Sequence, residues 1–393
     1  MKILFPIFFL TLLSCSTGDK QVLDYQKIHK NAILVDTHND ILTMSMEKGH
    51  VMNNDLTGKT HSDLTRFKKG GLDVQFFSVW SDGEKENPYQ FAIRQIDSLD
   101  AIANRNQNKL IVVKNTTEMM DVVKLGKIAA FFGVEGGHMI ENDIKKLENL
   151  YNRGVRYMTL TWNNSTDWAT SAADETSGKE LEYLGLTNFG KTVVKKMNKL
   201  GMMVDISHVG EQTFWDVINS TTKPIIASHS SAYTLCPHPR NLKDEQLKAI
   251  AKNGGVVQIN FYSGFIDSTY ASKKEAFLLV HKVEYDSLLN SSMTDYLAEE
   301  RLFGKYDLEE EAIRAPFDLV IAHIEYIINL IGEDYVGIGS DFDGIESTPQ
   351  HLDDVTTYPL ITKALLEKGY TTESVNKILG GNIIRVLKAN EAK

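Results

Sequence analysis

The feature that most constrains the fold of this chain is a regular alternation of short apolar segments with amphipathic ones. The apolar segments are rich in branched residues, and most are bounded by Gly, Pro or Asn, as buried strands are. Helical spacing of apolar residues follows in segments 89–106, 144–153, 186–200, 244–253 and 317–331. We predict eight strands, over residues 32–39, 72–80, 127–136, 155–162, 202–209, 224–230, 255–262 and 335–342.

Eight strands with intervening helices predict an α/β fold, a (β/α)8 TIM-like barrel. A doubly wound open sheet would use fewer strands, and the Gly-rich phosphate loop typical of its first strand does not follow Asp36. Two connections are long. We expect residues 41–71 to fold over the barrel mouth and residues 263–316 to form a helical insertion between strands seven and eight, as a lid or an oligomer contact. Residues 357–391 are expected to form two closing helices.

The first 14 residues differ from the rest of the chain. Lys2 precedes an apolar run, residues 3–13, that is too short to span a bilayer as a mature helix. The run ends at Ser14 and Cys15, which resembles a bacterial lipoprotein signal with its lipidated cysteine. We therefore predict a lipoprotein signal peptide over 1–14, a tether over 15–25 and a metal-dependent hydrolase barrel over 26–393.

This interpretation predicts an exported bacterial lipoprotein that is anchored to a membrane through Cys15, on the periplasmic side or at the cell surface. The alternative is a plain secretory signal in which Cys15 is incidental. Cys236 is the second of two cysteines, so lipidation of Cys15 leaves it without a disulfide partner. The net charge of −10 argues against nucleic-acid binding, which needs a basic surface.

Residues able to bind a metal fall at the ends of five predicted strands. They are His38 and Asp40 on the first strand, Glu135 on the third, His208 on the fifth, His229 on the sixth and Asp341 on the eighth. A single His-x-Asp is usually an ordinary polar strand end, but the repetition favours a shared site. Active sites of these barrels lie at the carboxyl ends of the strands, so we expect the six groups to meet there.

Three imidazoles and three carboxylates crowded together require a cation to balance their charge. Such ligands without thiolate suit zinc, with manganese, iron or cobalt as substitutes. Six ligands exceed what one catalytic zinc uses, so two Zn²⁺ ions are predicted. We expect His38 and Asp40 to bind one ion, His208 and His229 to bind the other, and Glu135 to bridge them.

Asp341 is then free to take the proton from a metal-bridging hydroxide or water and to pass it to the leaving group. Asp343 is an alternative ligand by spacing, but Asp341 ends the apolar strand. We also expect His138 to orient its neighbours and His61 to order the first long connection.

Five ordered motifs resemble the membrane dipeptidase (renal dipeptidase) family, and the similarity runs from about residue 33 to residue 386. The motifs are His38-Asn39-Asp40, Val134-Glu135-Gly136-Gly137-His138, Asp205-Ile206-Ser207-His208-Val209, Ser228-His229-Ser230-Ser231-Ala232-Tyr233 and Gly339-Ser340-Asp341-Phe342-Asp343-Gly344. The resemblance implies a two-zinc barrel that hydrolyses the peptide bond of dipeptides and often tolerates a D-residue at the C-terminal position. Family members are often dimers, which implies a homodimer here.

Carried over by position, the resemblance implies the same five metal ligands, with Glu135 bridging. It places Asp341 beside the substrate and implies that Arg240 binds the carboxylate of the substrate. Trp162 stands where animal members have a substrate-contacting histidine, so the group that contacts the tetrahedral oxyanion differs. We expect Trp162 to line the substrate site, and Tyr262 is the candidate for a second carboxylate-holding group.

Two other interpretations remain open at this stage. One is another amidohydrolase-type metal hydrolase, which acts on a lactone, an N-acyl amino acid or a cyclic amide. The other is a non-catalytic lipoprotein that captures peptides on a former enzyme scaffold. Trp162 is the one residue that favours the latter, and the presence of all six polar groups argues against it.

Overall fold

The structure is a computed structural model that describes residues 24–291 and 293–392. The predicted signal peptide, Cys15 and most of the predicted tether lie outside the described residues. The first described element is helix α1 (Tyr25–Asn31), and the Asp24 side chain accepts a hydrogen bond from the Lys27 amide at its start. Among the described residues, no helix combines the length and apolarity needed to cross a membrane.

All eight predicted strands are present, and neighbouring strands pair in parallel in the order β1-β2-β4-β5-β6-β7-β8-β9. Their bounds are β1 Leu34–Asp36, β2 Leu72–Trp80, β4 Ile128–Glu135, β5 Val155–Thr159, β6 Met203–Asp205, β7 Ile226–Ser230, β8 Val256–Ile259 and β9 Val336–Ile338. The backbones just beyond β9 and β1 meet at a parallel bridge between Asn39 and Phe342. The sheet is therefore a nearly closed barrel of the (β/α)8 type, as predicted.

A ninth strand, β3 (Leu110–Val112), was not predicted. It pairs only with the first half of β4, where Leu110 lies opposite Ile128. The second half of β4 pairs with β5, beginning at Phe132. β3 is as short as β1, β6 and β9, but it lies outside the ring of eight strands, at the side of β4, so an eight-stranded barrel does not require it.

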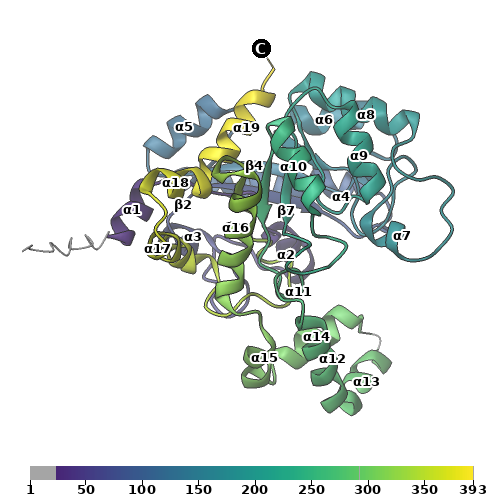
Figure 1. Cartoon of the computed structure of the whole chain (residues 1–393), viewed down its shortest axis with the longest axis vertical. Helices are drawn as coiled ribbons and strands as arrows, with labels where there is room; N and C mark the ends of the chain where they lie inside the picture. The colour runs from purple at the N-terminus through teal and green to yellow at the C-terminus, as the bar shows by residue number, and fades with distance from the viewer. Residues whose placement is uncertain (1–23, 292, 393) are drawn as a thin grey trace, which may run out of the picture.

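Long helices cover the barrel (Figure 1), and five of them match the predicted segments. These are α4 Pro88–Arg105, α6 Ile144–Asn152, α8 Asn188–Leu200, α10 Asp244–Asn253 and α16 Phe317–Ile331. Two others were not predicted, α5 (Thr116–Lys124) and α9 (Glu211–Ser220). Shorter helical segments are α7 Ala172–Thr176, η1 Gly137–Ile140, η2 Glu333–Tyr335 and η3 Val355–Thr357.

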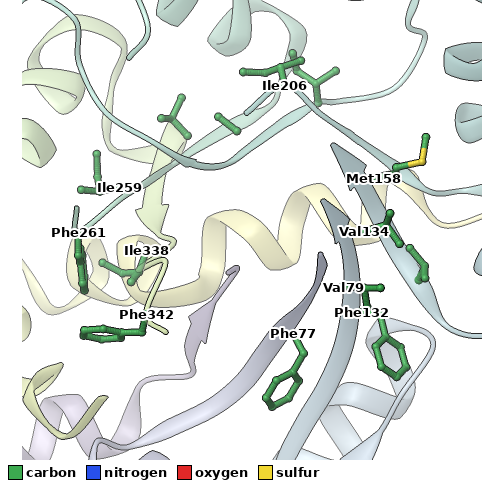
Figure 2. Close-up of a cluster of buried hydrophobic side chains, with 14 of the residues drawn as sticks. Phe77, Val79, Phe132, Val134, Met158, Ile206, Ile259, Phe261, Ile338 and Phe342 are labelled. Atoms are coloured by element: carbon green, nitrogen blue, oxygen red, sulfur yellow. The ribbon is translucent and has the colours of Figure 1, made fainter. Parts of the chain in front are cut away.

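The barrel separates two apolar layers, because successive strand residues face opposite sides. Figure 2 shows part of the outer layer, including Phe77 and Val79 of β2, which belongs to a buried cluster shared with the surrounding helices. Phe76 belongs instead to a second cluster, whose strand members include Val74, Ala129, Phe131, Met203, Ile226 and Val256. These residues lie mostly near the starts of their strands, so the opposite end of the barrel is left for polar side chains.

The first long connection, which was predicted to fold over the barrel mouth, lies against the loop that follows β9. It contains α2 (Ile41–Lys48) and α3 (Leu64–Lys69). The His61 amide donates to Asp343 Oδ1 at 2.6 Å, and the Asp343 amide donates to His61 Nδ1 at 2.9 Å. Asp343 therefore holds this connection in place, with help from the Ser62 hydroxyl.

The segment 263–316 is the predicted helical insertion between the last two strands of the barrel. It contains α11 Ser263–Ile266, α12 Tyr270–Val280, α13 Lys282–Asn290, α14 Asp295–Phe303 and α15 Asp307–Ile313. Helices α12 to α15 project from the barrel (Figure 1) and share a small apolar cluster that includes Phe277, Leu302 and Phe303. The Lys48 ammonium pairs with Glu300 at 2.7 Å, which ties α14 to the end of α2.

The C-terminal segment contains more elements than the two helices predicted. It consists of α17 (Pro359–Glu367), α18 (Thr372–Asn376), a π-helical turn at Lys377–Gly381 and α19 (Asn382–Asn390). Ile383, Val386 and Leu387 of α19 pack into the cluster inside the barrel. This last helix therefore closes the end of the barrel at which the strands begin.

Candidate functional site

The predicted ligands converge at the carboxyl ends of the strands, and Glu135 lies among them. Its Oε2 atom is 3.2 Å from His38 Nε2, and its Oε1 atom is 2.9 Å from His208 Nε2 and 3.5 Å from His229 Nε2. All four side chains are buried. A single carboxylate thus reaches imidazoles from three different strand ends.

The remaining carboxylates lie on the His38 side. Asp40 Oδ2 is 3.3 Å from His38 Nε2, and Asp341 Oδ1 is 3.9 Å from the same atom. In the part of the chain that is described, two groups have ligand atoms within 4.8 Å of one another: His38 with Glu135 and His229, and His38 with Asp40 and Asp341. All six groups predicted from strand ends are therefore gathered at one place.

On the other side of Glu135, the Nδ1 atoms of two imidazoles point at hydrogen-bond acceptors. His208 Nδ1 lies 3.1 Å from Asn163 Oδ1, and His229 Nδ1 lies 2.8 Å from Ser228 Oγ. The Ser228 hydroxyl donates to Asp205 Oδ2 at 2.6 Å, so it must accept from His229. Both imidazoles therefore carry their proton on Nδ1.

The Nε2 atoms of His208 and His229 lie 3.1 Å apart. With Nδ1 protonated on both rings, these two Nε2 atoms face each other with lone pairs, which is unfavourable unless a cation accepts both. Burial lowers the pKa of His208 to about 4 and that of His229 well below its ordinary value, so both rings are neutral at pH 7. Neutral imidazoles with Nδ1 bonded to an acceptor are the usual metal-ligand arrangement, so the residues fit a divalent metal.

The charges of the carboxylates follow from their surroundings. Burial acts to raise the pKa of Glu135, but the positive charge of the adjacent His38 holds its pKa well below the ordinary value. Burial raises the pKa of Asp341 well above its ordinary value; nearby carboxylates add to the rise and His38 opposes it. Glu135 is thus suited to remain an anion, and Asp341 is suited to hold a proton.

Two of these residues occupy an unusual backbone conformation. His208 has a φ of 65° and Asp341 has a φ of 64°. Both lie in the left-handed region, which is unfavourable for residues other than glycine and is often found at functional sites. Each follows the end of a strand rather than lying within it, so the alternation of strand side chains does not set its direction.

Arg240 lies beside this cluster and is buried, with 7% exposure. One terminal nitrogen, Nη2, donates to the His229 carbonyl at 3.3 Å, and Nε has no hydrogen-bond partner among the described residues. Burial lowers the pKa of Arg240 to about 10, so it remains a cation at pH 7. A buried guanidinium with an unused donor is suited to a carboxylate.

Trp162 and Tyr262, the other two residues expected to contact the substrate, differ from each other in their surroundings. The ring centroids of Trp162 and His208 are 6.4 Å apart, and Trp162 also packs edge-on against Trp80 at 5.0 Å. Tyr262 donates its hydroxyl to Glu346 of the loop after β9, so this donor is already used. Trp162 is therefore at the wall of the site, whereas Tyr262 is tied to the rim.

Several supporting residues were missed in the sequence. Asn260 donates to Asp341 Oδ2 at 2.8 Å, which leaves Oδ1 directed toward His38. Asp205 supports His229 through Ser228, and the spacing Asp205-x-x-His208 was the only sequence signal for it. His138, expected to orient its neighbours, has Nε2 3.2 Å from Ser81 Oγ.

A parallel barrel with three imidazoles and three carboxylates at its carboxyl-terminal mouth defines a metal-dependent hydrolase. Residues 23–393 match the family model described as membrane dipeptidase, peptidase family M19. The chain belongs to this family, and it is a metal-dependent dipeptidase.

Individual relatives agree with this assignment. A dipeptidase of Schizosaccharomyces pombe, described as uncharacterised, is 34% identical over 388 residues, which cover 93% of this chain and 82% of the relative. The fold resembles that of the probable dipeptidase PvdM from Pseudomonas aeruginosa, with a TM-score of 0.76, 22% identity and coverage of 93% and 97% of the two chains. A metallopeptidase from Rhodobacter sphaeroides, liganded with a phosphinate mimic of the dipeptide L-Ala-D-Ala, has a TM-score of 0.73, 23% identity and coverage of 92% and 100%.

Proposed function

We propose that this dipeptidase uses two zinc ions and accepts dipeptides with a D-residue at the C-terminal position. The observation that carries the proposal is the position of Glu135 between the Nε2 atoms of His38 and His208. Imidazole and carboxylate ligands without thiolate suit zinc. When bound, such a pair of ions would activate a water molecule as the nucleophile and would polarise the scissile carbonyl.

The side chains divide into two ligand sets that share one carboxylate. In the proposal, His38 and Asp40 hold one ion, and His208 and His229 hold the other. Glu135 serves both, because its two oxygens face opposite sides of the cluster. The His38 and His229 rings, which belong to different ligand sets, have centroids 3.9 Å apart, which supports two closely spaced ions rather than two separate sites.

Asp341 is the proposed proton carrier. Asn260 holds one of its oxygens, and the other faces the cluster. The raised pKa allows Asp341 to take a proton during attack and to return it to the nitrogen of the departing amino acid. Arg240 binds the terminal carboxylate of the substrate, which limits the substrate to a short peptide.

The proposed tolerance of a D-residue is supported by one relative. The Rhodobacter sphaeroides metallopeptidase is described as liganded with a mimic of L-Ala-D-Ala. The same family relationship supports the proposal that this chain accepts substrates of that class. Trp162 would then form part of the wall of the site. It lacks the imidazole that a histidine at this position would offer to the substrate oxyanion.

The proposal also covers where the enzyme works. The first 14 residues and Cys15 favour export and lipid attachment, so we propose that the enzyme is tethered to a membrane outside the cytoplasm. A homodimer is proposed from the family resemblance alone.

The purified protein tests the activity directly. We expect hydrolysis of both L-Ala-L-Ala and L-Ala-D-Ala, loss of both activities with a chelator, and recovery on addition of zinc. A lactone and an N-acyl amino acid serve as comparison substrates, and preference for either over the dipeptides would contradict the proposal. Hydrolysis of L-Ala-L-Ala alone would contradict only the tolerance of a D-residue.

A further inference from the structure

Tyr157 of β5 crosses the inside of the barrel and reaches the backbone that follows β1. Its side chain is fully buried. The hydroxyl oxygen lies 2.8 Å from His38 Nδ1, and the hydroxyl donates to the Thr37 carbonyl at 2.9 Å. A residue of the apolar interior therefore contacts one of the proposed metal ligands on the side that faces away from the metal.

The directions of these two hydrogen bonds follow from the groups involved. A phenol has one proton, and the Thr37 carbonyl is able only to accept. The proton of Tyr157 therefore points at Thr37, and the phenol oxygen must accept from His38. Nδ1 of His38 therefore carries a proton, and Nε2, on the side of Asp40 and Glu135, is the nitrogen left to give its lone pair to a metal ion.

The barrel is built to hold the Tyr157 ring in this place. Gly133 of β4 lies opposite Tyr157 in the sheet, and a Cβ atom at Gly133 would overlap the ring. The ring also packs against Phe76 of β2, with centroids 5.6 Å apart. The missing side chain at position 133 makes room for a tyrosine that reaches across the barrel.

We propose that Tyr157 is a positioning residue that fixes the tautomer and the direction of His38, so that its Nε2 atom is ready for a metal ion. This inference rests on the proposed function, in which His38 is a ligand. Hydrogen bonds to the outer nitrogen of a metal-binding histidine orient the ring and increase its basicity. His208 and His229 receive the same support from Asn163 and Ser228, but only Tyr157 comes from the apolar interior.

The variant Tyr157→Phe removes the hydroxyl and keeps the ring. We expect one of the two zinc ions to bind about 10- to 100-fold more weakly in a competition titration against a chelating indicator. Tyr326→Phe is the matched control, because it removes a tyrosine hydroxyl bonded at 2.8 Å to Asp244, which is none of the proposed metal ligands. Zinc affinity equal to wild type in Tyr157→Phe would overturn the proposal.

Two further measurements separate positioning from a purely structural role. In the metal-free state, Tyr157→Phe should melt close to the wild-type temperature, whereas its zinc affinity should be clearly lower. A lower melting temperature with unchanged zinc affinity would overturn the proposal. Long-range ¹⁵N–¹H NMR of the zinc-loaded wild type should show the His38 proton on Nδ1 alone, and a proton on Nε2 would overturn the proposal without any variant. Wild type that binds no zinc would instead overturn the proposed function.

Discussion

The Oε1 atom of Glu135 lies 2.9 Å from Nε2 of His208, although their strands, β4 and β6, are separated in the sheet by β5. The second oxygen of the same carboxylate faces His38, from the opposite side of the cluster. Glu135 is therefore shared by the two proposed ligand sets, and its replacement should weaken metal binding at both.

Glu135→Gln tests this relationship with almost no change in shape. We expect loss of at least one zinc ion and a fall in kcat/KM of more than about 100-fold, because even residues that only support metal ligands contribute about 10- to 100-fold. Zinc content and dipeptide turnover should be measured on the same preparation. Glu367→Gln, at a 65% exposed side chain on α17, is the control, and a Glu135 variant with two ions and full activity would refute the bridging role.

Arg240→Ala should weaken substrate binding. A hydrogen bond to a charged group contributes about 1.5–3 kcal/mol, so we expect KM for dipeptides to rise about 10- to 100-fold. Zinc content should stay at the wild-type value, because no Arg240 atom is among the proposed ligands. An unchanged KM would rule out the carboxylate assignment; Arg385→Ala, which removes an arginine bonded to the Gly254 carbonyl, controls for loss of charge.

Asp341→Asn should slow the chemical step. The amide has nearly the shape of the carboxylate but does not accept and return a proton, so kcat should fall about 10²- to 10⁴-fold. KM should change little. Steady-state kinetics in enzyme that retains two zinc ions checks this prediction, and a variant with wild-type kcat would exclude Asp341 as the proton carrier.

The stability of the fold should depend on pH through His323. This histidine of α16 is fully buried, with Nδ1 3.1 Å from the Ala232 amide and Nε2 3.0 Å from the Ile266 carbonyl. Burial lowers its pKa from 6.5 to about 4. The unfolded chain therefore binds this proton first as the pH falls, so the contribution of His323 is complete above about pH 6.5 and decreases as the pH falls toward 4.

Unfolding by urea at pH 7 and pH 5 measures this effect. Between these two values, His323 should reduce the free energy of unfolding by about 2 kcal/mol. His323→Gln should be less stable than wild type at pH 7, and its free energy of unfolding should fall by correspondingly less between pH 7 and pH 5. The same decrease in both proteins would show that His323 is not responsible.

The sequence predicted the barrel because its main strands are apolar runs with clear boundaries. The short β3 was missed because Leu110–Val112 pairs with β4 outside the ring of barrel strands, and this pairing is not visible in the sequence. The insertion over 263–316 was predicted as helical without its breaks, such as the one between α12, which ends at Val280, and α13, which spans Lys282–Asn290. Helix breaks of this kind depend on tertiary packing, which periodicity does not reveal.

The candidate ligands were predictable because each follows a recognisable strand. The residues that support these ligands were not predictable. Tyr157, for example, contacts His38 from across the barrel, although the two residues are 119 positions apart in the sequence. Likewise, His208 points at Glu135 from a left-handed backbone conformation, which strand alternation does not predict. The sequence thus identified which residues meet, and the structure adds which nitrogen each imidazole presents.

The central claim is that a pair of zinc ions is held on either side of Glu135. X-ray diffraction at the zinc absorption edge, from crystals of the zinc-loaded protein, tests this most directly. The account predicts two anomalous peaks about 3.5–4 Å apart, with the Glu135 carboxylate between them. A single peak, or peaks away from His38 and His208, would contradict it.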